Sequence, residues 1–330
     1  MTARVRVIRG GVLESSHAVH AVVVERERPV LTLGDAGRWT FYRSAAKPFQ
    51  ALPLVEDGVF EALGFGRREL ALACGSHSAE PRHLEVATAM RDTLGVSDDD
   101  LACGGHWPLQ EAAALRFLER GRAPGRLDSN CSGKHLGMLA LALHHGWTIA
   151  GYHEPSHPVQ IRMRRETSRW SGVPDEGLRE AVDGCGVVCF AVPLVEMARS
   201  FARFAGAARH EGGPGEVCRA MTAHPDLVAG TGRLCTDLMS AAPGIVAKVG
   251  AEGVYGALVP EAGLGLAIKV EDGGWRAVDA VLVALLEHLG LLTGEARGAL
   301  AGYLEPILLN TRGDAVGTLE VDLGVDGPTA

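Results

Sequence analysis

Apolar and polar positions near the start of the chain follow the pattern of β-strands. Arg4–Arg9 alternates charged and apolar residues, Ala18–Glu25 is a nearly continuous apolar run, and Pro29–Leu33 is a shorter one. Strand-like runs return at Val254–Val259 and Leu264–Val270, with glycine-rich turns beside them. Short runs with this spacing, bounded by turn residues, are typical of strands. Both ends of the chain are therefore predicted to contribute strands.

Between these strands the apolar residues recur with helical spacing, from about Ser44 to Ser240. The predicted helices are Glu111–Arg120, Lys134–His144, Pro158–Ser168, Leu194–Phe204, Gly215–Ala223 and, after the last strands, Val278–Leu289. This order predicts an α+β fold in which N- and C-terminal strands complete one antiparallel sheet, with a helical region inserted between them. We expect a single domain over residues 1–330, with a sheet region of about 1–43 and 241–330 and a helical region of about 44–240.

Composition excludes several classes of protein. Of the 330 residues, 47% are hydrophobic and 22% charged, as in ordinary folded proteins. The net charge of -8 argues against nucleic acid or an anionic membrane as the main partner, because both require a basic surface. The longest apolar stretches, 136–143 and 280–286, are shorter than the ~20 residues of a membrane span, and no signal peptide is evident. Seven scattered cysteines favour reduced thiols, so we expect a cytoplasmic protein.

Lysine is scarce, and its positions direct attention to possible chemistry. Only four of the 32 basic residues are lysine, and lysine, unlike arginine, can become neutral and act as a base. Ser44 and Lys47 are spaced i, i+3, which places the amine beside the hydroxyl on one helical face. Pro48 is tolerated only near a helix start, so Ser44 is predicted to lie in a first turn. The pair suits an acylating serine with a lysine base, and a chance Ser-x-x-Lys is the alternative.

Two further segments fit the same chemistry. Lys248 and Gly250 form a Lys-x-Gly element before the C-terminal strands, as in Ser-x-x-Lys enzymes, and Gly250 would let a substrate approach the backbone. The alternative for Lys248 is a lysine at a strand edge. Ser76 lies in a loop of small residues and is a candidate second hydroxyl. In the same loop His77 and His83 are either metal ligands or ordinary loop histidines, and we favour the second interpretation.

A third segment contains Cys131 and Lys134 on one helical face. The Gly-Lys pair here is not a phosphate-binding loop, because neither the earlier glycine nor the following Ser or Thr is present. With Cys185, these residues could form a small metal or polar site, and thiolates suit zinc. The alternative is a pair of buried cysteines that act as small apolar residues.

Taken together, these segments resemble the L-asparaginase II family of rhizobial and actinobacterial type. The matching strings are Glu14–His17, Arg43–Ala51, Ser76–His83, Asn130–His135, Asp183–Cys185, Val228–Met239 and Lys248–Gly253. They run in family order over nearly the whole chain, and the Asn130–His135 string is the most specific. Two positions depart from the family pattern: Val188 stands where a proline is usual, and Val19 where a glycine is common.

The resemblance implies a fold related to serine β-lactamases and glutaminases, a homodimer, and hydrolysis of L-asparagine to L-aspartate and ammonia. It implies two catalytic Ser-Lys pairs, Ser44 with Lys47 and Ser76 with Lys248, and one zinc ion held by Cys131, Lys134 and Cys185. Residues expected to bind the substrate are Arg43, His135, Asp183, Arg233 and Glu252. The alternatives are another Ser-Lys amidase, such as a glutaminase or a β-lactamase-like hydrolase, and a non-catalytic homologue that binds zinc or an amino acid.

Overall fold

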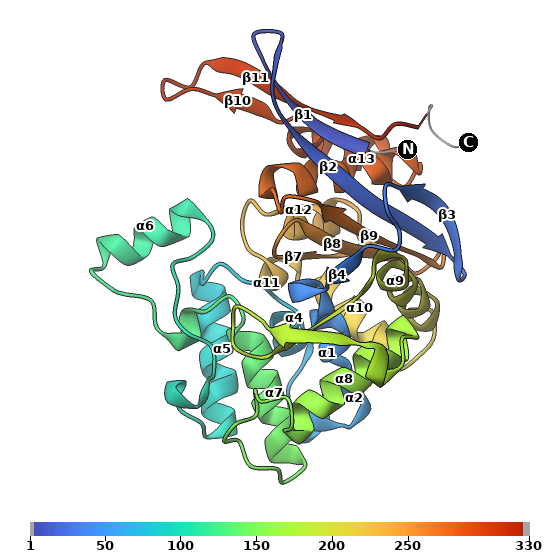
Figure 1. Ribbon diagram of the computed structural model, residues 1–330. Coiled ribbons are helices and arrows are strands. Elements are labelled where there is room, and N and C mark those ends of the chain that lie inside the picture. The colour runs from blue at the N-terminus through green and yellow to red at the C-terminus, as the bar shows by residue number, and fades with distance from the viewer. Residues whose placement is uncertain (1–2, 326–330) are drawn as a thin grey trace. The chain divides into compact units, whose positions relative to one another are not determined.

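Strands from both ends of the chain pair in one antiparallel sheet in the computed structural model, which describes residues 3–325 (Figure 1). The sheet has eight strands in the order β10-β11-β1-β2-β9-β8-β7, and β3 also pairs with β2. Their bounds are β1 Ala3–Arg9, β2 Val12–Glu25, β3 Arg28–Leu33, β7 Val246–Gly250, β8 Val254–Val259, β9 Leu264–Val270, β10 Ile307–Leu309 and β11 Ala315–Asp322. The pairing of β2 with β9 joins N- and C-terminal strands, which confirms the predicted α+β architecture.

The chain divides into two compact units. Unit 1 comprises Met1–Ala45, Val192–Gly206 and Asp237–Ala330, and unit 2 comprises Ala46–Ala191 and Ala207–Thr236. The sheet belongs to unit 1. The stretch 192–206, which the sequence pattern placed in the helical region, belongs to unit 1 as well.

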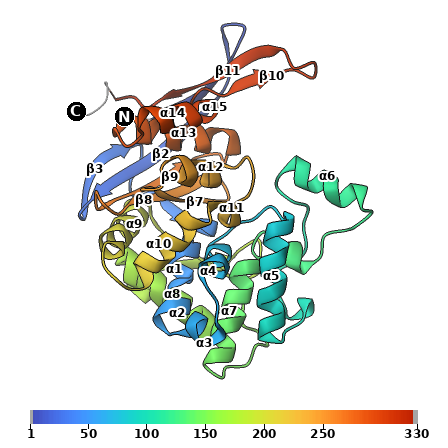
Figure 2. The same cartoon turned by 180° about the vertical axis from the view of Figure 1, so that it is seen from behind.

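Helices cover the sheet in unit 1. Helix α13 (Trp275–His288) packs on β8, β9 and β11 through a stripe of buried apolar residues. Figure 2 shows this helix from behind. Helix α9 (Leu194–Ala208) lies very close to β8 and β9. A Cβ atom at Gly256 on β8 or at Gly265 on β9 would collide with this helix, so only glycine fits at both positions. The remaining elements here are β4 (Trp39–Phe41), η1 (Arg43–Ala46), α12 (Leu234–Ala241), α14 (Gly294–Ala299) and α15 (Ala301–Leu304).

Unit 2 is mainly helical and is built around α7 (Ser132–His144), whose residues 132–142 are all buried. Over residues 136–143 this helix is apolar on every side, and a helix of that kind has to lie inside a fold. Helices α2, α3, α4, α5 and α8 pack around it. The helices of this unit are α1 (Lys47–Gln50), α2 (Leu52–Glu56), α3 (Val59–Leu63), α4 (Arg67–Ala73), α5 (Pro81–Leu94), α6 (Glu111–Glu119), α8 (Pro158–Ser171), α10 (Gly213–Ala223) and α11 (Pro225–Val228), with short 3₁₀ turns η2 (Asp98–Asp100), η3 (Arg126–Asp128) and η4 (Asp175–Gly177).

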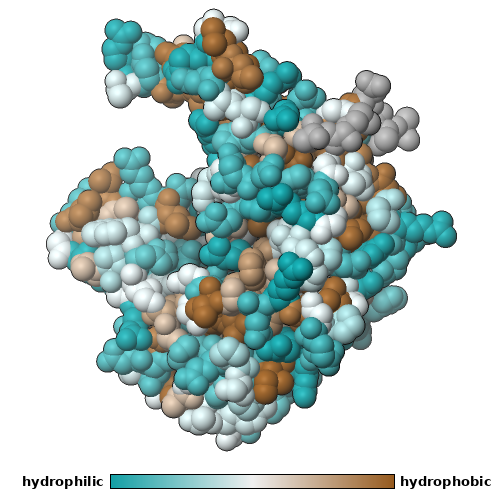
Figure 3. Space-filling model, viewed as in Figure 1, coloured by the Kyte–Doolittle hydropathy of each residue, from teal (hydrophilic) through white to brown (hydrophobic). Residues whose placement is uncertain are grey.

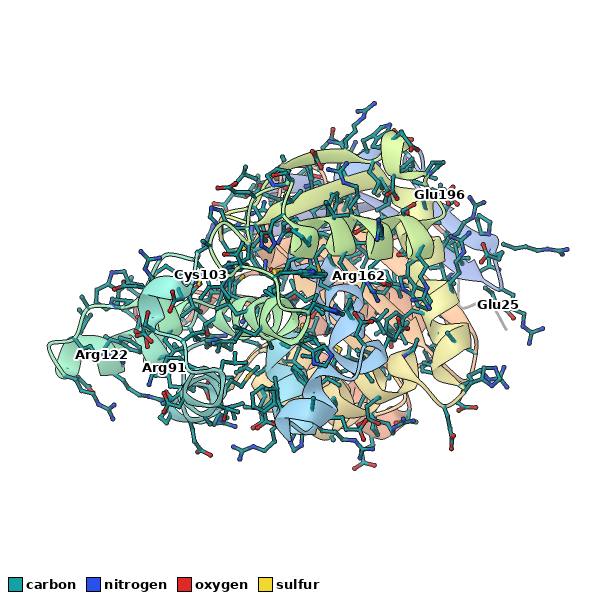
Figure 4. All side chains as sticks on the ribbon, turned by 90° about the horizontal axis from the view of Figure 1, so that it is seen from below. Glu25, Arg91, Cys103, Arg122, Arg162 and Glu196 are labelled. Carbon is teal, nitrogen blue, oxygen red and sulfur yellow. The ribbon has the colours of Figure 1, made fainter. Side chains whose placement is uncertain are left out.

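Two features of unit 2 lie outside its packed helices. Helix α6 projects away from α4, α5 and α7 (Figures 1 and 2). Strands β5 (Arg179–Val182) and β6 (Val188–Pro193) pair antiparallel and carry the turn that contains Cys185. In Figure 4, Arg91 and Arg122 lie toward the outer end of this unit, while Cys103 lies nearer to its helices.

Candidate functional site

Lys47 is the first residue of α1 and is completely buried. It follows η1, which contains Ser44, and Pro48 occupies the first turn of α1, so the predicted placement of Ser44 in a first turn is confirmed. The Lys47 Nζ contacts the carbonyl oxygen of Gly75, lies 3.0 Å from Ser76 Oγ and lies 3.4 Å from the carbonyl oxygen of Asn130.

The surroundings of Lys47 lower the pKa of its amine. Burial lowers the pKa of Lys47; the nearby Cys131 opposes this shift, and the positive charge of Lys134 adds to it. The Nζ donates to Ser76 Oγ and to the two carbonyl oxygens, and it also forms a side-chain hydrogen bond with Cys131. The contact between Lys47 and Ser76 differs from the sequence-based pairing, which gave Ser76 to Lys248.

Ser76 is positioned by backbone contacts at the end of α4. Its N–H donates to the Val228 carbonyl at 2.7 Å, and its own carbonyl accepts from the Arg233 guanidinium. Gly75 makes this turn possible, because a Cβ there would lie 2.7 Å from the Leu227 carbonyl oxygen. Arg233, which the resemblance assigns to substrate binding, thus holds the backbone of Ser76 in this structure.

Cys131, Lys134 and Cys185 lie together in unit 2, with Asp183 beside them. The Lys134 Nζ is 2.9 Å from Cys185 Sγ and 3.8 Å from Asp183 Oδ2, and Cys185 Sγ is 3.6 Å from the same carboxylate oxygen. A thiol hydrogen bond joins Cys131 to Cys185. The loop keeps Cys185 in place because the Asp183 N–H donates to Val187 O and the Gly186 N–H donates to Asp183 O.

The cluster is electrostatically polarised. The hydrogen bond from Cys131, together with the Lys134 cation, lowers the pKa of Cys185 to about 6, against the effect of burial. The same hydrogen bond, with burial, raises the pKa of Cys131 to about 12. Burial acts to lower the pKa of Lys134, but its interactions with Cys185, Cys131 and Asp183 outweigh burial and raise that pKa. Cys185 is therefore a thiolate paired with the Lys134 ammonium.

The donor set fits a zinc ion in type. Zinc in structural sites is four-coordinate, and two sulfurs, an amine and a carboxylate would supply four ligands. Across residues 3–325, no group of three His, Cys, Asp or Glu side chains is arranged to hold a metal ion, so a zinc site here requires the lysine. Tetrahedral zinc would hold an amine and a thiolate about 3.5 Å apart, so the 2.9 Å contact is a hydrogen bond that metal binding has to open.

His135 lies one helical turn beyond Cys131 and is completely buried. Its Nδ1 lies 2.5 Å from the Tyr152 hydroxyl, which also accepts the Ala102 N–H at 2.9 Å. Burial and the positive charge of Lys134 lower the pKa of His135 to about 3, so the ring is neutral. Its Nε2 is buried and has no hydrogen-bond partner among the described residues.

His77 lies in the loop before α5, as we favoured, whereas His83 lies in the first turn of α5, so the loop interpretation is wrong for His83. The Nδ1 of His77 accepts the Ala79 N–H, and its Nε2 lies 2.8 Å from Ser132 Oγ. The Nδ1 of His83 accepts the Glu80 N–H, and its Nε2 lies 2.7 Å from a backbone carbonyl oxygen. All four ring nitrogens are engaged within the protein, which leaves none of them to a metal.

The remaining predicted residues belong to unit 1. Arg43 has a left-handed backbone with φ of 49°, a strained conformation for a residue with a side chain, directly before Ser44. Lys248 lies on β7, is buried and donates to the Val249 carbonyl at 2.8 Å. Glu252 is exposed, has φ of 63° and accepts a hydrogen bond from Lys269 through its carbonyl.

Gly250 has a different role from the one expected. A Cβ at this position would lie 2.7 Å from the Tyr42 carbonyl oxygen, so the space is filled by the backbone that leads to Ser44. The prediction that Gly250 admits substrate is therefore wrong, because protein backbone already makes the close approach. Instead, the glycine holds the end of β7 against the Ser44 segment.

Sequence reasoning missed two groups in unit 2. The carbonyl of Asn130 contacts Lys47, and the strongly patterned string 130–135 that contains it was a usable signal. Tyr152 contacts His135, but it lies in an irregular stretch between α7 and α8 where no motif marks it.

Comparisons with known proteins address the whole chain. No helix within residues 3–325 has the length and apolar character to cross a membrane. None of the curated proteins matches the sequence. A solved structure described as a putative β-lactamase from Bacteroides dorei is 12% identical with a TM-score of 0.39, covering 82% of this chain and 93% of the other. A structure described as Mglu is 17% identical with a TM-score of 0.39, covering 83% and 67%. At these scores neither likeness defines the fold.

The family comparison is decisive. The model of the L-asparaginase II family matches residues 5–321, which is nearly the full chain and includes every predicted site residue. Members of this family are L-asparaginases, enzymes that hydrolyse the side-chain amide of asparagine. The chain belongs to the L-asparaginase II family and is an enzyme of that kind.

Proposed function

We propose that this enzyme converts L-asparagine to L-aspartate and ammonia through a serine acyl-enzyme that depends on two Ser-Lys pairs. Ser44 is the nucleophile and Lys47 its base. Ser76 and Lys248 form the second pair. The observation that carries the proposal is the buried Lys47 Nζ, which lies 3.0 Å from Ser76 Oγ and also contacts two carbonyl oxygens and the Cys131 side chain.

The proton route follows from these roles. The Ser44 oxygen attacks the side-chain amide carbon and passes its proton to Lys47. Lys47 is in hydrogen-bond contact with Ser76, so Ser76 relays that proton to the leaving nitrogen. The C–N bond breaks, ammonia leaves, and an aspartyl ester of Ser44 remains. Water then hydrolyses the ester and restores the serine hydroxyl.

Substrate recognition rests on buried polar groups, because an unpaired buried group strongly rejects an analogue that lacks its partner. Arg43, His135, Asp183, Arg233 and Glu252 are the residues assigned to it. His135 has an unoccupied ring nitrogen that supports this role. Arg233 and Glu252 are supported more weakly, since Arg233 is engaged with the Ser76 backbone and the Glu252 side chain is exposed.

Cys131, Lys134 and Cys185 hold one zinc ion, which supplies a positive charge that helps to position substrate. The support is the donor set and the thiolate character of Cys185. Val188 begins β6 and is buried at the position where proline is usual, and β6 pairs normally there, so this departure leaves the Cys185 turn intact.

The enzyme acts as a homodimer in the cytoplasm. Val12 and Leu13, at the turn between β1 and β2, are 67% and 53% exposed, and Ile307 and Leu309 on edge strand β10 are 61% and 63% exposed. Figure 3 shows apolar side chains on these hairpins. Exposed apolar edges of this kind mark contact surfaces. None of the seven cysteines, all within the described residues, forms a disulfide, which suits a reducing compartment.

Ammonia release from asparagine and from glutamine tests the function directly. The wild-type protein should release ammonia from asparagine faster than from glutamine, and Ser44→Ala and Lys47→Arg should each lose at least roughly a hundredfold in kcat. Lys269→Arg, which makes the same change at the remaining lysine, is the matched control and should retain activity. Full activity in Ser44→Ala, with an acyl-enzyme trapped on Ser76 by rapid quench and mass spectrometry, would reverse the roles of the two serines.

A further inference from the structure

The pair formed by His135 and Tyr152 contains one polar atom without a partner. The two rings meet edge to face with centroids 5.7 Å apart, and the Nδ1 of His135 lies 2.5 Å from the hydroxyl oxygen. The His135 Nε2 is buried and lacks a hydrogen-bond partner within residues 3–325. A buried polar atom left unpaired is costly, so a hydrogen-bonding group of a bound substrate would be stabilised at this nitrogen.

The position of the ring proton follows from counting partners. The Tyr152 hydroxyl oxygen already accepts the Ala102 N–H at 2.9 Å. If the hydroxyl donates to His135 Nδ1, Tyr152 is fully satisfied and only Nε2–H remains unpaired. If Nδ1–H donates instead, both the hydroxyl proton and Nε2 lack partners. The first arrangement leaves fewer buried groups unsatisfied, so it is the stable one.

Tyr152 is held in this position from two further directions. Its side chain is 1% exposed, and its backbone carbonyl accepts a hydrogen bond from Gln160 Nε2 at 2.9 Å. Gln160 lies on α8, so the turn that carries Tyr152 is fixed to a regular helix. His135 is fixed as well, because its backbone N–H donates to the Cys131 carbonyl at 3.0 Å.

We propose that Tyr152 is a positioning residue that holds His135 in the tautomer with a proton on Nε2, so that His135 serves as a fixed hydrogen-bond donor to an acceptor oxygen of the substrate. The inference rests on the proposed function and names how its site recognises an amino-acid amide. A neutral donor of this kind pairs with a carboxylate or carbonyl oxygen.

Nuclear magnetic resonance of ¹⁵N-histidine-labelled protein measures the tautomer. The wild-type spectrum should contain a histidine with a protonated Nε2 and a bare Nδ1 that disappears in His135→Gln. In Tyr152→Phe the His135 signals should move toward a mixture of tautomers. A wild-type His135 with its proton on Nδ1 would overturn the inference, whatever the enzyme hydrolyses.

Steady-state kinetics test the donor role. Tyr152→Phe should raise KM for asparagine roughly tenfold with little change in kcat, because the lost hydrogen bond acts on bound substrate and transition state alike. His135→Gln places an amide N–H where Nε2–H was and needs no tautomer. Tyr152→Phe should therefore have no further effect on KM in the His135→Gln background, whereas an equal rise in KM there would contradict the inference.

Tyr303→Phe is the matched control, because it also removes a single tyrosine hydroxyl, one that donates to Asp237 at 2.6 Å in unit 1. It should leave KM unchanged. If Tyr152→Phe does not fold, the His135 tautomer measured in the wild-type protein still tests the inference. If the wild-type protein has the Nε2–H tautomer but does not hydrolyse asparagine, the proposed function is wrong, whereas the assignment of the His135 tautomer stands.

Discussion

The amine of Lys134 lies 2.9 Å from the sulfur of Cys185, and the two form an ammonium–thiolate pair. A metal ion can use this amine only after the ammonium loses its proton. The cation therefore holds Cys185 as a thiolate in the metal-free protein and competes with zinc for it. Zinc binding at this site should release protons and strengthen as the pH rises.

Replacing Lys134 by Arg should abolish zinc binding while preserving the positive charge. Guanidinium stays protonated at any accessible pH and offers no lone pair to a metal. We expect zinc content, measured by mass spectrometry of the metal in purified protein, to fall from one ion per chain to near zero, with KM for asparagine raised more than kcat is lowered. Cys218→Ser alters another buried cysteine, on α10, and should retain zinc. Stoichiometric zinc in Lys134→Arg would remove the lysine from the ligand set.

The rate should depend on pH through Lys47. Burial holds the pKa of Lys47 below its ordinary value, and the neutral amine is the active base. We expect kcat/KM to rise with pH through that lowered pKa and then level off. The unfolded chain keeps this proton to higher pH than the folded chain does, so the free energy of unfolding should also rise with pH up to about 10.4.

The measurement is kcat/KM across about pH 5 to 10, with the unfolding free energy measured in parallel. Lys269→Arg supplies the control, because burial also lowers the pKa of Lys269 while it lies outside the proposed mechanism. The acid limb should persist in that variant. Its disappearance there, or a flat profile in the wild-type enzyme, would mean that Lys47 is not the base.

Charged residues on the edge strand should dissociate the proposed homodimer. Ile307 and Leu309 point to solvent from β10 and are more than half exposed, so glutamate at both positions would place charges in the contact surface. We expect the double variant to be a monomer by light scattering at concentrations where the wild type is a dimer. Leu118→Glu changes an equally exposed leucine on α6 and should stay dimeric. A dimer that persists in the β10 variant would place the interface elsewhere.

Burial explains part of the outcome for the strands: β3 was predicted although only Leu33 in it is buried, and the buried strands β6 and β7 were missed. β2 contains six consecutive buried residues, and its apolar run predicted it. β11 has a single fully buried residue, Leu319, and every residue of β5 is exposed. A strand without a buried face has no apolar alternation, so its pairing depends on neighbours that are remote in sequence. The predicted pattern therefore missed both.

In the candidate site, some features can be predicted from the sequence and others cannot. Residue types and short spacings are enough to identify Ser44, Lys47 and the Cys131–Lys134 segment from the sequence. The contact between Lys47 and Ser76 could not be predicted in this way. Ser76 is 29 residues away in the sequence, and the turn at Gly75 brings it to Lys47. Hydrogen bonds between distant segments depend on tertiary packing, and local spacing does not contain that information.

Gly75→Ala should damage the site through the backbone. An added Cβ would lie 2.7 Å from the Leu227 carbonyl oxygen and 2.9 Å from that of Leu72, so the turn carrying Ser76 has to shift. Forcing a methyl group into packed backbone costs roughly 1–3 kcal/mol of unfolding free energy. We expect a loss of that size in chemical denaturation and a larger fractional loss of kcat, because Ser76 would move from Lys47. Gly104→Ala, whose Cβ would meet nothing within 4 Å, should change neither quantity. Wild-type kcat in Gly75→Ala would show that the contact between Ser76 and Lys47 does not limit catalysis.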